Sequence, residues 1–93
     1  MVDKNGRITI RKELLKRTAV KAGSKVDICF NPVRKSLVIR PANEEKIGNL
    51  YFISENTIDD KGRLFIPNCI REVFKNSNFL VTEKDGEIYI LII

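Results

Sequence analysis

The sequence contains no histidine and only two cysteines, Cys29 and Cys69. Without histidine, the chain lacks the commonest general base and the usual partner of a serine or cysteine nucleophile. No paired carboxylates or phosphate-binding glycine loop take its place, so we expect a protein that is not an enzyme and has no catalytic residues. Two cysteines cannot supply the four ligands of an ordinary zinc site, so we expect no metal and no other cofactor. Both thiols lie in apolar stretches, and we expect them to be buried and reduced.

Long apolar runs are also missing. No run approaches the roughly 18 residues of a membrane span, and the polar residues 1–7 lack the apolar segment of a signal peptide. A composition of 43% apolar and 31% charged residues is typical of a globular protein, and 93 residues suit one compact domain. These features predict a soluble, cytoplasmic protein whose small core needs an economical fold or a partner chain.

Positive charge is concentrated in the first half of the chain. Residues 1–46 contain twelve Lys and Arg against five Asp and Glu, a balance of +7, whereas residues 47–93 contain five against seven, a balance of −2. Such a concentration of basic residues favours a polyanion as the partner. Charge alone leaves DNA, RNA, an acidic protein and a membrane surface open as partners.

The chain contains an internal repeat with an offset of 56 residues. Residues 2–10 (VDKNGRITI) align with residues 58–66 (IDDKGRLFI), with identical Asp, Gly, Arg and final Ile. A short helical pattern and then two apolar, strand-like segments follow each copy. A single D-x-x-G-R motif is weak evidence, whereas two copies with the same downstream organisation indicate a duplicated β-turn-β unit.

Each shared position of the motif has a local structural reason. Asp3 and Asp59 can open a tight turn, because their carboxylates can bond backbone N–H groups two residues further on. Gly6 and Gly62 can supply the positive φ that closes such a turn. The apolar-x-apolar residues that follow alternate as they do in a half-buried strand.

The arginine after each glycine, Arg7 or Arg63, has two interpretations. It can pair with the aspartate of its own turn, which is a purely structural role. A guanidinium can also form that pair while it offers its remaining donors to a phosphate or a base edge. The sequence leaves both interpretations open.

Two short helices are expected, one after each motif. Residues 11–20 (RKELLKRTAV) place their apolar side chains on one side of a helix and leave the basic ones to solvent. Residues 67–74 (PNCIREVF) form a second apolar stripe, and the leading proline suits a first helical turn. Both helices are only about two turns long, so packing against the strands has to stabilise them.

Strand-like segments fill most of the remaining chain. They are residues 25–30, 36–40, 50–53, 79–82 and 87–93. The first two flank a turn at 31–35, and the last two flank a Lys-Asp-Gly hairpin turn. The apolar run 88–93 is far too short for a membrane tail, and we expect it to be an interior strand or one paired across a subunit interface.

This order of strand, D-x-x-G-R turn, strand, short helix and β-hairpin resembles the AbrB/SpoVT/MraZ/MazE superfamily of swapped-hairpin barrels. Residues 57–67 (TIDDKGRLFIP) are most similar to an MraZ repeat, and residues 2–41 to an AbrB DNA-binding domain. The resemblance implies a mainly β fold with two short helices, in which two β-β-α-β-β-like repeats interleave into a swapped-hairpin (double-split) β-barrel. AbrB-type proteins form it from two chains, whereas MraZ-type proteins carry both repeats in one chain.

The resemblance also implies a domain organisation and a function. It divides the chain into a first AbrB-like repeat at 1–41, a linker at 42–48 and a second MraZ/AbrB-like repeat at 49–93, and we expect the two repeats to form one barrel domain. Association of such barrels into a homo-oligomer would be typical of the superfamily. The implied function is that of a transcription regulator, cytoplasmic and nucleoid-associated, that contacts the phosphates and groove edges of double-stranded DNA.

The residues expected to contact DNA are cations of the turns and helices. They are Lys4, Arg7, Arg11, Lys12, Lys16, Arg17, Lys61, Arg63 and Arg71. We expect the first repeat to contribute most of the contacts, because it lies in the basic half of the chain. The alternative is an antitoxin-like protein-interaction module of MazE type, although such antitoxins usually append a long acidic tail, and this sequence stops at its last strand.

Overall fold

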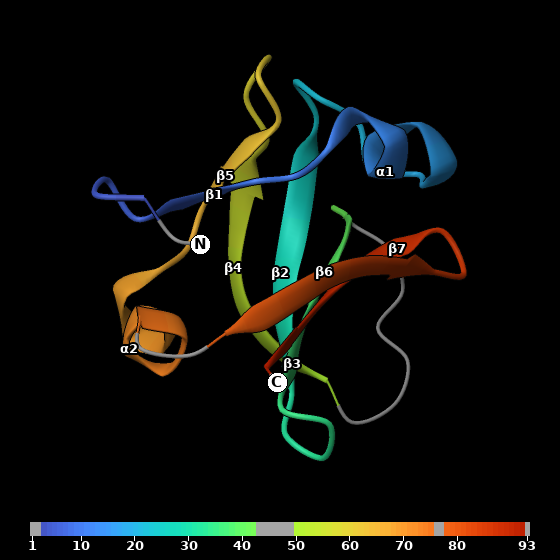
Figure 1. Ribbon diagram of the computed structural model, residues 1–93. Helices are drawn as coiled ribbons and strands as arrows, with labels where there is room; N and C mark the ends of the chain where they lie inside the picture. Colours follow the sequence, from blue (N-terminus) through green and yellow to red (C-terminus); the bar gives the residue numbers. More distant parts are fainter. Residues whose placement is uncertain (1–2, 43–49, 76–77, 93) are drawn as a thin grey trace.

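The computed structural model describes residues 3–42, 50–75 and 78–92, with the backbone alone at 73–75. The chain is mainly β with two short helices, as expected (Figure 1). In chain order the elements are β1 (Arg7–Thr9), α1 (Lys12–Arg17), β2 (Lys25–Asn31), β3 (Ser36–Pro41), β4 (Tyr51–Thr57), β5 (Arg63–Phe65), α2 (Asn68–Lys75), β6 (Phe79–Lys84) and β7 (Glu87–Ile92).

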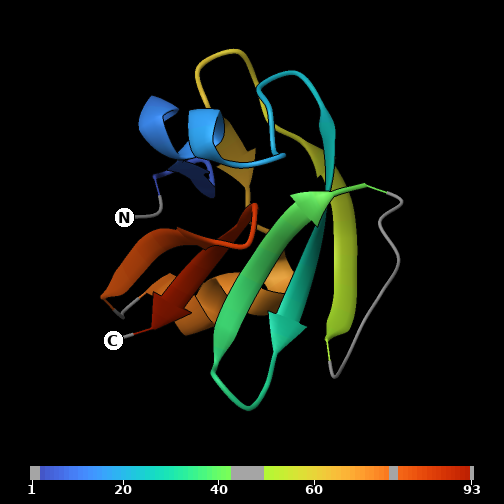
Figure 2. The same ribbon diagram turned by 90° about the vertical axis from the view of Figure 1, so that its right-hand side faces the viewer.

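The strands form two antiparallel sheets. Five strands lie in the order β4-β2-β3-β7-β6, and β1 pairs with β5 in a separate two-stranded ribbon. This β1–β5 ribbon crosses in front of β4 and β2 in Figure 1. Because β1 and β5 run in opposite directions, the helix that follows each of them lies at an opposite end of the ribbon, as the two views show (Figures 1 and 2).

The ribbon pairs the two copies of the motif with each other. Ile8 and Leu64, which hold the same position in the two repeats, lie directly opposite each other. Two equivalent hydrogen bonds of 2.8 Å extend the pairing, from Ile10 N–H to Gly62 O and from Ile66 N–H to Gly6 O. The final strands of the two repeats, β3 and β7, also pair antiparallel. The two repeats are therefore related by a pseudo-two-fold axis.

The hydrophobic core lies between one face of the five-stranded sheet and the ribbon. Both repeats contribute to it, and the helices close its ends with Leu14 and Leu15 of α1 and Ile70 of α2. The largest side chains with almost no exposure are Ile10, Ile28, Leu37, Ile39, Ile58, Leu64, Ile66, Ile88 and Ile90. Aliphatic residues thus fill the core, as the alternation of the motif strands predicted.

The described strands are not closed into a barrel. β4 and β6 form the two edges of the larger sheet, and β1 and β5 pair only with each other. The expected barrel closure is therefore not observed, although the repeats do exchange strands, since β2 of the first pairs with β4 of the second.

Most local expectations agree with the structure. β7 lies between β3 and β6, so the described part of the run 88–93 is an interior strand. α1 and α2 lie within one or two residues of their expected starts, although α1 ends at Arg17 rather than near residue 20. Most of the expected linker at 42–48 lies outside the described residues.

The expected burial of both thiols was wrong for one of them. Cys29 is buried and Cys69 is exposed, and neither forms a disulfide. Cys69 is the second residue of α2, and the next residue, Ile70, is the one that points into the core. Successive residues of a helix are about 100° apart around its axis, so Cys69 faces solvent.

One charged group is buried within the larger sheet. Arg40 of β3 is 8% exposed, and its Nε lies 2.8 Å from Oε2 of Glu87 on β7. On the other side, Arg40 lies opposite Asp27 of β2, which is also buried. The arginine is thus flanked by a carboxylate on each neighbouring strand, which is how buried charges are usually stabilised.

Candidate functional site

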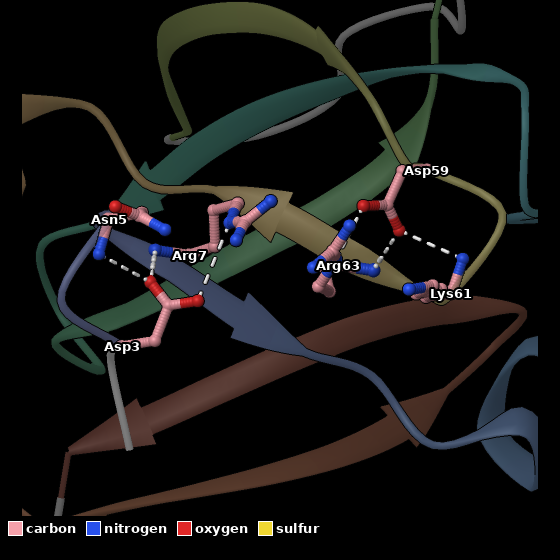
Figure 3. A network of polar contacts seen from close by, with 6 residues as sticks. All are labelled: Asp3, Asn5, Arg7, Asp59, Lys61 and Arg63. Atoms are coloured by element: carbon pink, nitrogen blue, oxygen red, sulfur yellow. Dashed lines mark hydrogen bonds and ion pairs between the residues drawn. The ribbon is translucent and has the colours of Figure 1, made fainter.

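Two equivalent turns present the motif residues at opposite ends of the β1–β5 ribbon (Figure 3). In the first turn, Asp3 Oδ1 accepts the N–H groups of Asn5 and Arg7 at 2.8 and 2.9 Å. The second turn repeats both bonds with Asp59 Oδ1, at 2.9 and 2.8 Å. The glycine of each turn has a φ of +78°. These contacts confirm the predicted roles of the aspartate and the glycine.

Each motif arginine pairs with the aspartate of its own turn. Arg63 Nε lies 2.6 Å from Asp59 Oδ2, and Arg7 Nε lies 3.4 Å from Asp3 Oδ2. Among the described residues, the contacts of both guanidinium groups run through Nε, and 29% and 31% of the two side-chain surfaces are exposed. The structural pairing is therefore present, and the terminal nitrogens are still able to donate to a bound anion.

The turns also hold both aspartates in their charged form. The backbone N–H of Arg7 is the main reason that the pKa of Asp3 lies below its ordinary value, and the N–H of Arg63 has the same effect on the pKa of Asp59. The guanidinium of Arg7 lowers the pKa of Asp3 further, and the guanidinium of Arg63 does the same for Asp59. Each arginine is thus oriented by an ionised partner at neutral pH.

The outward face of the ribbon carries both arginines. Side chains alternate between the two faces of a strand, and the central residue of each ribbon strand points into the core. The flanking residues therefore share the opposite face, and they are Arg7, Thr9, Arg63 and Phe65. The cross-repeat pairing thus places two motif arginines, far apart in sequence, on one surface.

A basic cleft of about 230 Å³ lies at one end of the ribbon, where α1 of the first repeat meets the turn of the second. Its charged lining residues are Lys12 and Lys16 of α1, Lys21 just after α1, and Asp60 and Lys61 of the second turn. Four lysines against one aspartate give these lining residues a net positive charge, which favours an anion as the partner. The structure therefore brings together three of the expected DNA-contacting residues, Lys12, Lys16 and Lys61.

The close approach of α1 to this turn depends on a glycine. A Cβ atom built on Gly62 would lie 2.7 Å from Ile10 O and 3.5 Å from Leu15 Cδ1. The first of these is a backbone atom of the ribbon and has no freedom to move aside. Gly62 therefore serves the packing of the cleft in addition to the turn.

At the other end of the ribbon, an arginine replaces this apolar contact. Arg71 of α2 holds the position that Leu15 holds in α1, and its guanidinium covers Gly6. Nη2 and Nε of Arg71 donate to Ile66 O at 3.0 and 3.2 Å, and its Cζ lies 4.8 Å from the centre of the Phe65 ring. The structure thus gives Arg71 a packing role at the first turn, and its DNA contact stays a prediction.

The charges around this second end differ from those of the basic cleft. Asn68 and Glu72 of α2 hold the positions of Lys12 and Lys16 in α1. Among the expected site residues, only Lys4 of the first turn adds an exposed positive charge here, beside the half-buried Arg71. The two ends of the pseudo-symmetric ribbon therefore share a backbone but carry different surfaces.

Arg11 and Arg17, the last two expected site residues, lie at the two ends of α1 and are exposed. Arg11 precedes the helix and makes no side-chain cap. Both therefore flank the lysines of α1 without belonging to the lining of the cleft.

Lys21 is a cleft residue that the sequence did not predict. Its Nζ donates to Leu15 O at 3.0 Å, at the end of α1. The available signal was a lysine shortly after a helix, where its side chain often bonds the last carbonyls. Its place near Lys61 depends on the packing of the two repeats, which the sequence does not reveal.

Other kinds of site are not found in the described residues. They contain no group of three or more His, Cys, Asp or Glu side chains that could hold a metal ion. None of the helices in residues 3–42, 50–75 and 78–92 is long and apolar enough to cross a membrane. Comparison with known proteins finds no matching family model, curated protein or solved structure for this chain.

Proposed function

We propose that the protein is a transcription regulator of the AbrB/MraZ type that binds double-stranded DNA through the β1–β5 ribbon and the lysines of α1. One observation carries this proposal: both motif arginines lie on the outward face of a two-stranded ribbon, with the basic cleft at its end. The two repeats exchange strands, which supports the resemblance to the AbrB/MraZ superfamily. In this proposal, the two sheets are an open form of the swapped-hairpin barrel.

The ribbon is the element that enters the DNA. The major groove of B-DNA is about 12 Å wide and admits a two-stranded β-ribbon. Arg7 and Arg63 keep their Nε atoms on the turn aspartates and donate their terminal nitrogens to phosphates or to base edges. Because the aspartates hold the guanidinium groups in place, little side-chain entropy is lost when DNA binds.

The lysines of the basic cleft contact phosphates beside the groove. Lys12, Lys16 and Lys61 are exposed and close to the Arg63 end of the ribbon. Phosphate contacts of this kind fix the position of a protein on the duplex and supply most of its salt-dependent affinity. The α1 end of the ribbon therefore provides most of the affinity for DNA. The proposed location of the protein is the cytoplasm, in association with the nucleoid.

The experiment is a salt titration of duplex binding by fluorescence anisotropy. Lys12→Gln/Lys16→Gln is expected to weaken binding about tenfold or more at low salt and to reduce the slope of log K against log[salt] by about two. The matched control is Arg34→Gln/Lys35→Gln, which removes the same charge from the β2–β3 turn, far from α1 in Figure 1. This control is expected to keep the wild-type slope.

Arg7→Ala and Arg63→Ala test the ribbon itself. Each is expected to weaken duplex binding, and if neither does, the ribbon is not the contact surface even where the lysine variant confirms DNA binding. A salt-independent affinity, or equal losses in the lysine variant and its control, would contradict the proposal. Co-purification of an acidic protein in fixed ratio would instead favour the antitoxin-like alternative.

A further inference from the structure

The basic cleft has an apolar floor that the proposed contacts with DNA do not use. Its uncharged lining residues are Leu15 of α1, Ala22 between α1 and β2, and Gly62 of the second turn, and carbon atoms form most of its inner surface. The lysines add to this surface, because a lysine lays its hydrocarbon stem along apolar groups and keeps only the amine polar. A phosphate group of DNA can pair with the amines, but it has no apolar part that could cover the floor.

The floor is apolar because of a difference between the two ends of the ribbon. Arg71 of α2 places its guanidinium over Gly6, whereas Leu15, which holds the equivalent position in α1, places a methyl group beside Gly62. Gly62 has no side chain of its own, and Ala22 adds only a methyl group. An apolar surface with room above it therefore lies at the α1 end, where the other end has a cation of the protein itself.

The charge of the lining favours a doubly charged anion. Four lysines against one aspartate, Asp60, give these residues a net charge of +3. A phosphate monoester carries a charge of about −1.5 to −2 at neutral pH, and lysine is a common ligand of phosphate. One of the four amines is held in place, because Lys21 Nζ donates to Leu15 O at 3.0 Å. A phosphate monoester therefore complements this charge better than a carboxylate does.

We propose that the cleft binds a small phosphate monoester with an apolar body, and that this ligand displaces DNA. The cleft volume of about 230 Å³ is below the roughly 300–1,000 Å³ of sites for drug-sized ligands, so the body is no larger than about one aromatic ring. The phosphate pairs with the lysines that are proposed to contact DNA, and the body covers Leu15 and Ala22. The ligand site is independent of the proposed function, whereas the displacement of DNA rests on it.

An NMR titration without DNA tests the ligand site. Phenyl phosphate is the probe, inorganic phosphate has the charge without the ring, and benzoate has the ring with a single charge. We expect phenyl phosphate to bind about tenfold or more tightly than either, because it alone uses both the lysines and the floor. It is also expected to shift the amide signals of Leu15, Ala22 and Gly62. Equal affinity for phenyl phosphate and inorganic phosphate, or no shift at these three residues, would overturn the proposal.

A substitution that fills the cleft tests its location. Ala22→Leu adds apolar volume and keeps every lysine, and it is expected to weaken binding of phenyl phosphate about tenfold or more. Ala19→Leu is the matched control, because Ala19 is also exposed but does not line the cleft. Circular dichroism checks that both variants are folded, and the wild-type titration depends on neither. Unchanged affinity in Ala22→Leu, or an equal loss in the control, would contradict the proposed site.

The displacement of DNA is measured by fluorescence anisotropy of a labelled duplex at constant ionic strength. Phenyl phosphate is expected to release the duplex from the wild type at a concentration about tenfold or more below that of inorganic phosphate, and to lose this advantage in Ala22→Leu. Phenyl phosphate that binds in the cleft without releasing the duplex would contradict the displacement. A chain that binds no duplex would refute the proposed function and the displacement with it, while the titration without DNA still supports or overturns the ligand site.

Discussion

Ile8 and Leu64 lie directly opposite each other at the centre of the β1–β5 ribbon, although 56 residues separate them in the chain. Both are buried, and they hold the same position in the two repeats. The turns on either side follow the same relationship, so the chain contains pairs of positions with the same backbone and different surroundings. A substitution at one position of such a pair can therefore be compared with the same substitution at the other.

Gly62→Ala is expected to destabilise the protein more than Gly23→Ala. Both glycines have a positive φ, +78° and +83°, which costs an alanine about 1 kcal/mol. At Gly62 the new Cβ would also lie 2.7 Å from Ile10 O, whereas at Gly23 it would meet nothing within 4 Å. We expect the free energy of unfolding, measured by urea denaturation, to fall by about 3 kcal/mol in Gly62→Ala and by about 1 kcal/mol in Gly23→Ala.

Gly6→Ala is expected to lie between these two values. The atoms that its Cβ would meet belong to the guanidinium of Arg71, at the end of a flexible side chain. Equal losses at Gly62 and Gly23 would mean that the close approach of Ile10 O to Gly62 does not contribute to the cost of the substitution.

Acid unfolding is expected to depend on the two turn aspartates. Because the folded-state pKa values of Asp3 and Asp59 are lowered, their contribution to stability is fully present above the unfolded pKa of about 4 and is lost as the pH falls through the folded values. In Asp3→Asn/Asp59→Asn, the thermal midpoint is expected to fall less between pH 5 and pH 2 than in the wild type. Asp85→Asn in the β6–β7 turn is the control, and parallel curves for all three proteins would contradict this expectation.

Removal of the buried arginine is expected to be strongly destabilising. In Arg40→Met, Glu87 and the facing Asp27 lose the cation between them, and the expected cost is about 3 kcal/mol or more. Arg34→Met, at an exposed position of the β2–β3 turn, is expected to change stability by less than about 0.5 kcal/mol. Chemical denaturation measures both, and a loss at Arg40 as small as that at Arg34 would show that the pair is dispensable.

The weaker end of the ribbon is expected to become a better DNA-binding surface when it is given the charges of the stronger one. Asn68→Lys/Glu72→Lys places lysines at the positions equivalent to Lys12 and Lys16. We expect tighter duplex binding and a salt slope steeper by about two, because two phosphate contacts are added. The control is the same pair of lysines at Tyr51 and Glu55 on β4. An equal gain in duplex affinity there would mean that net charge alone, and not the position of the lysines, explains the effect.

The sequence predicted the features that depend on neighbouring residues. The bonds from Asp3 Oδ1 to the N–H groups two and four residues further on are local, and so is the positive φ of the following glycine. Both therefore follow from the motif. The apolar alternation likewise identified Ile8 and Ile10 as core residues.

The sequence did not predict the features that depend on packing between the two repeats. Lys61 lines the same cleft as Lys12 because the ribbon joins the two copies of the motif. The guanidinium of Arg71 covers Gly6, more than sixty positions away, for the same reason. The exposure of Cys69 depends on the rotation of α2 about its own axis, which an apolar neighbourhood in the sequence does not define.

The pairing of β1 only with β5 has a kinetic consequence. Among the described residues, the strand-to-strand hydrogen bonds of residues 7–9 form only when residues 63–65 arrive, so a loop of more than fifty residues must close before the ribbon is stabilised. Closing this loop lowers the conformational entropy of the chain before the stabilising contacts have formed. Folding therefore becomes slower as the sequence separation of contacting residues increases. We therefore expect a chain that folds slowly for its size, with neither half a stable intermediate on the way.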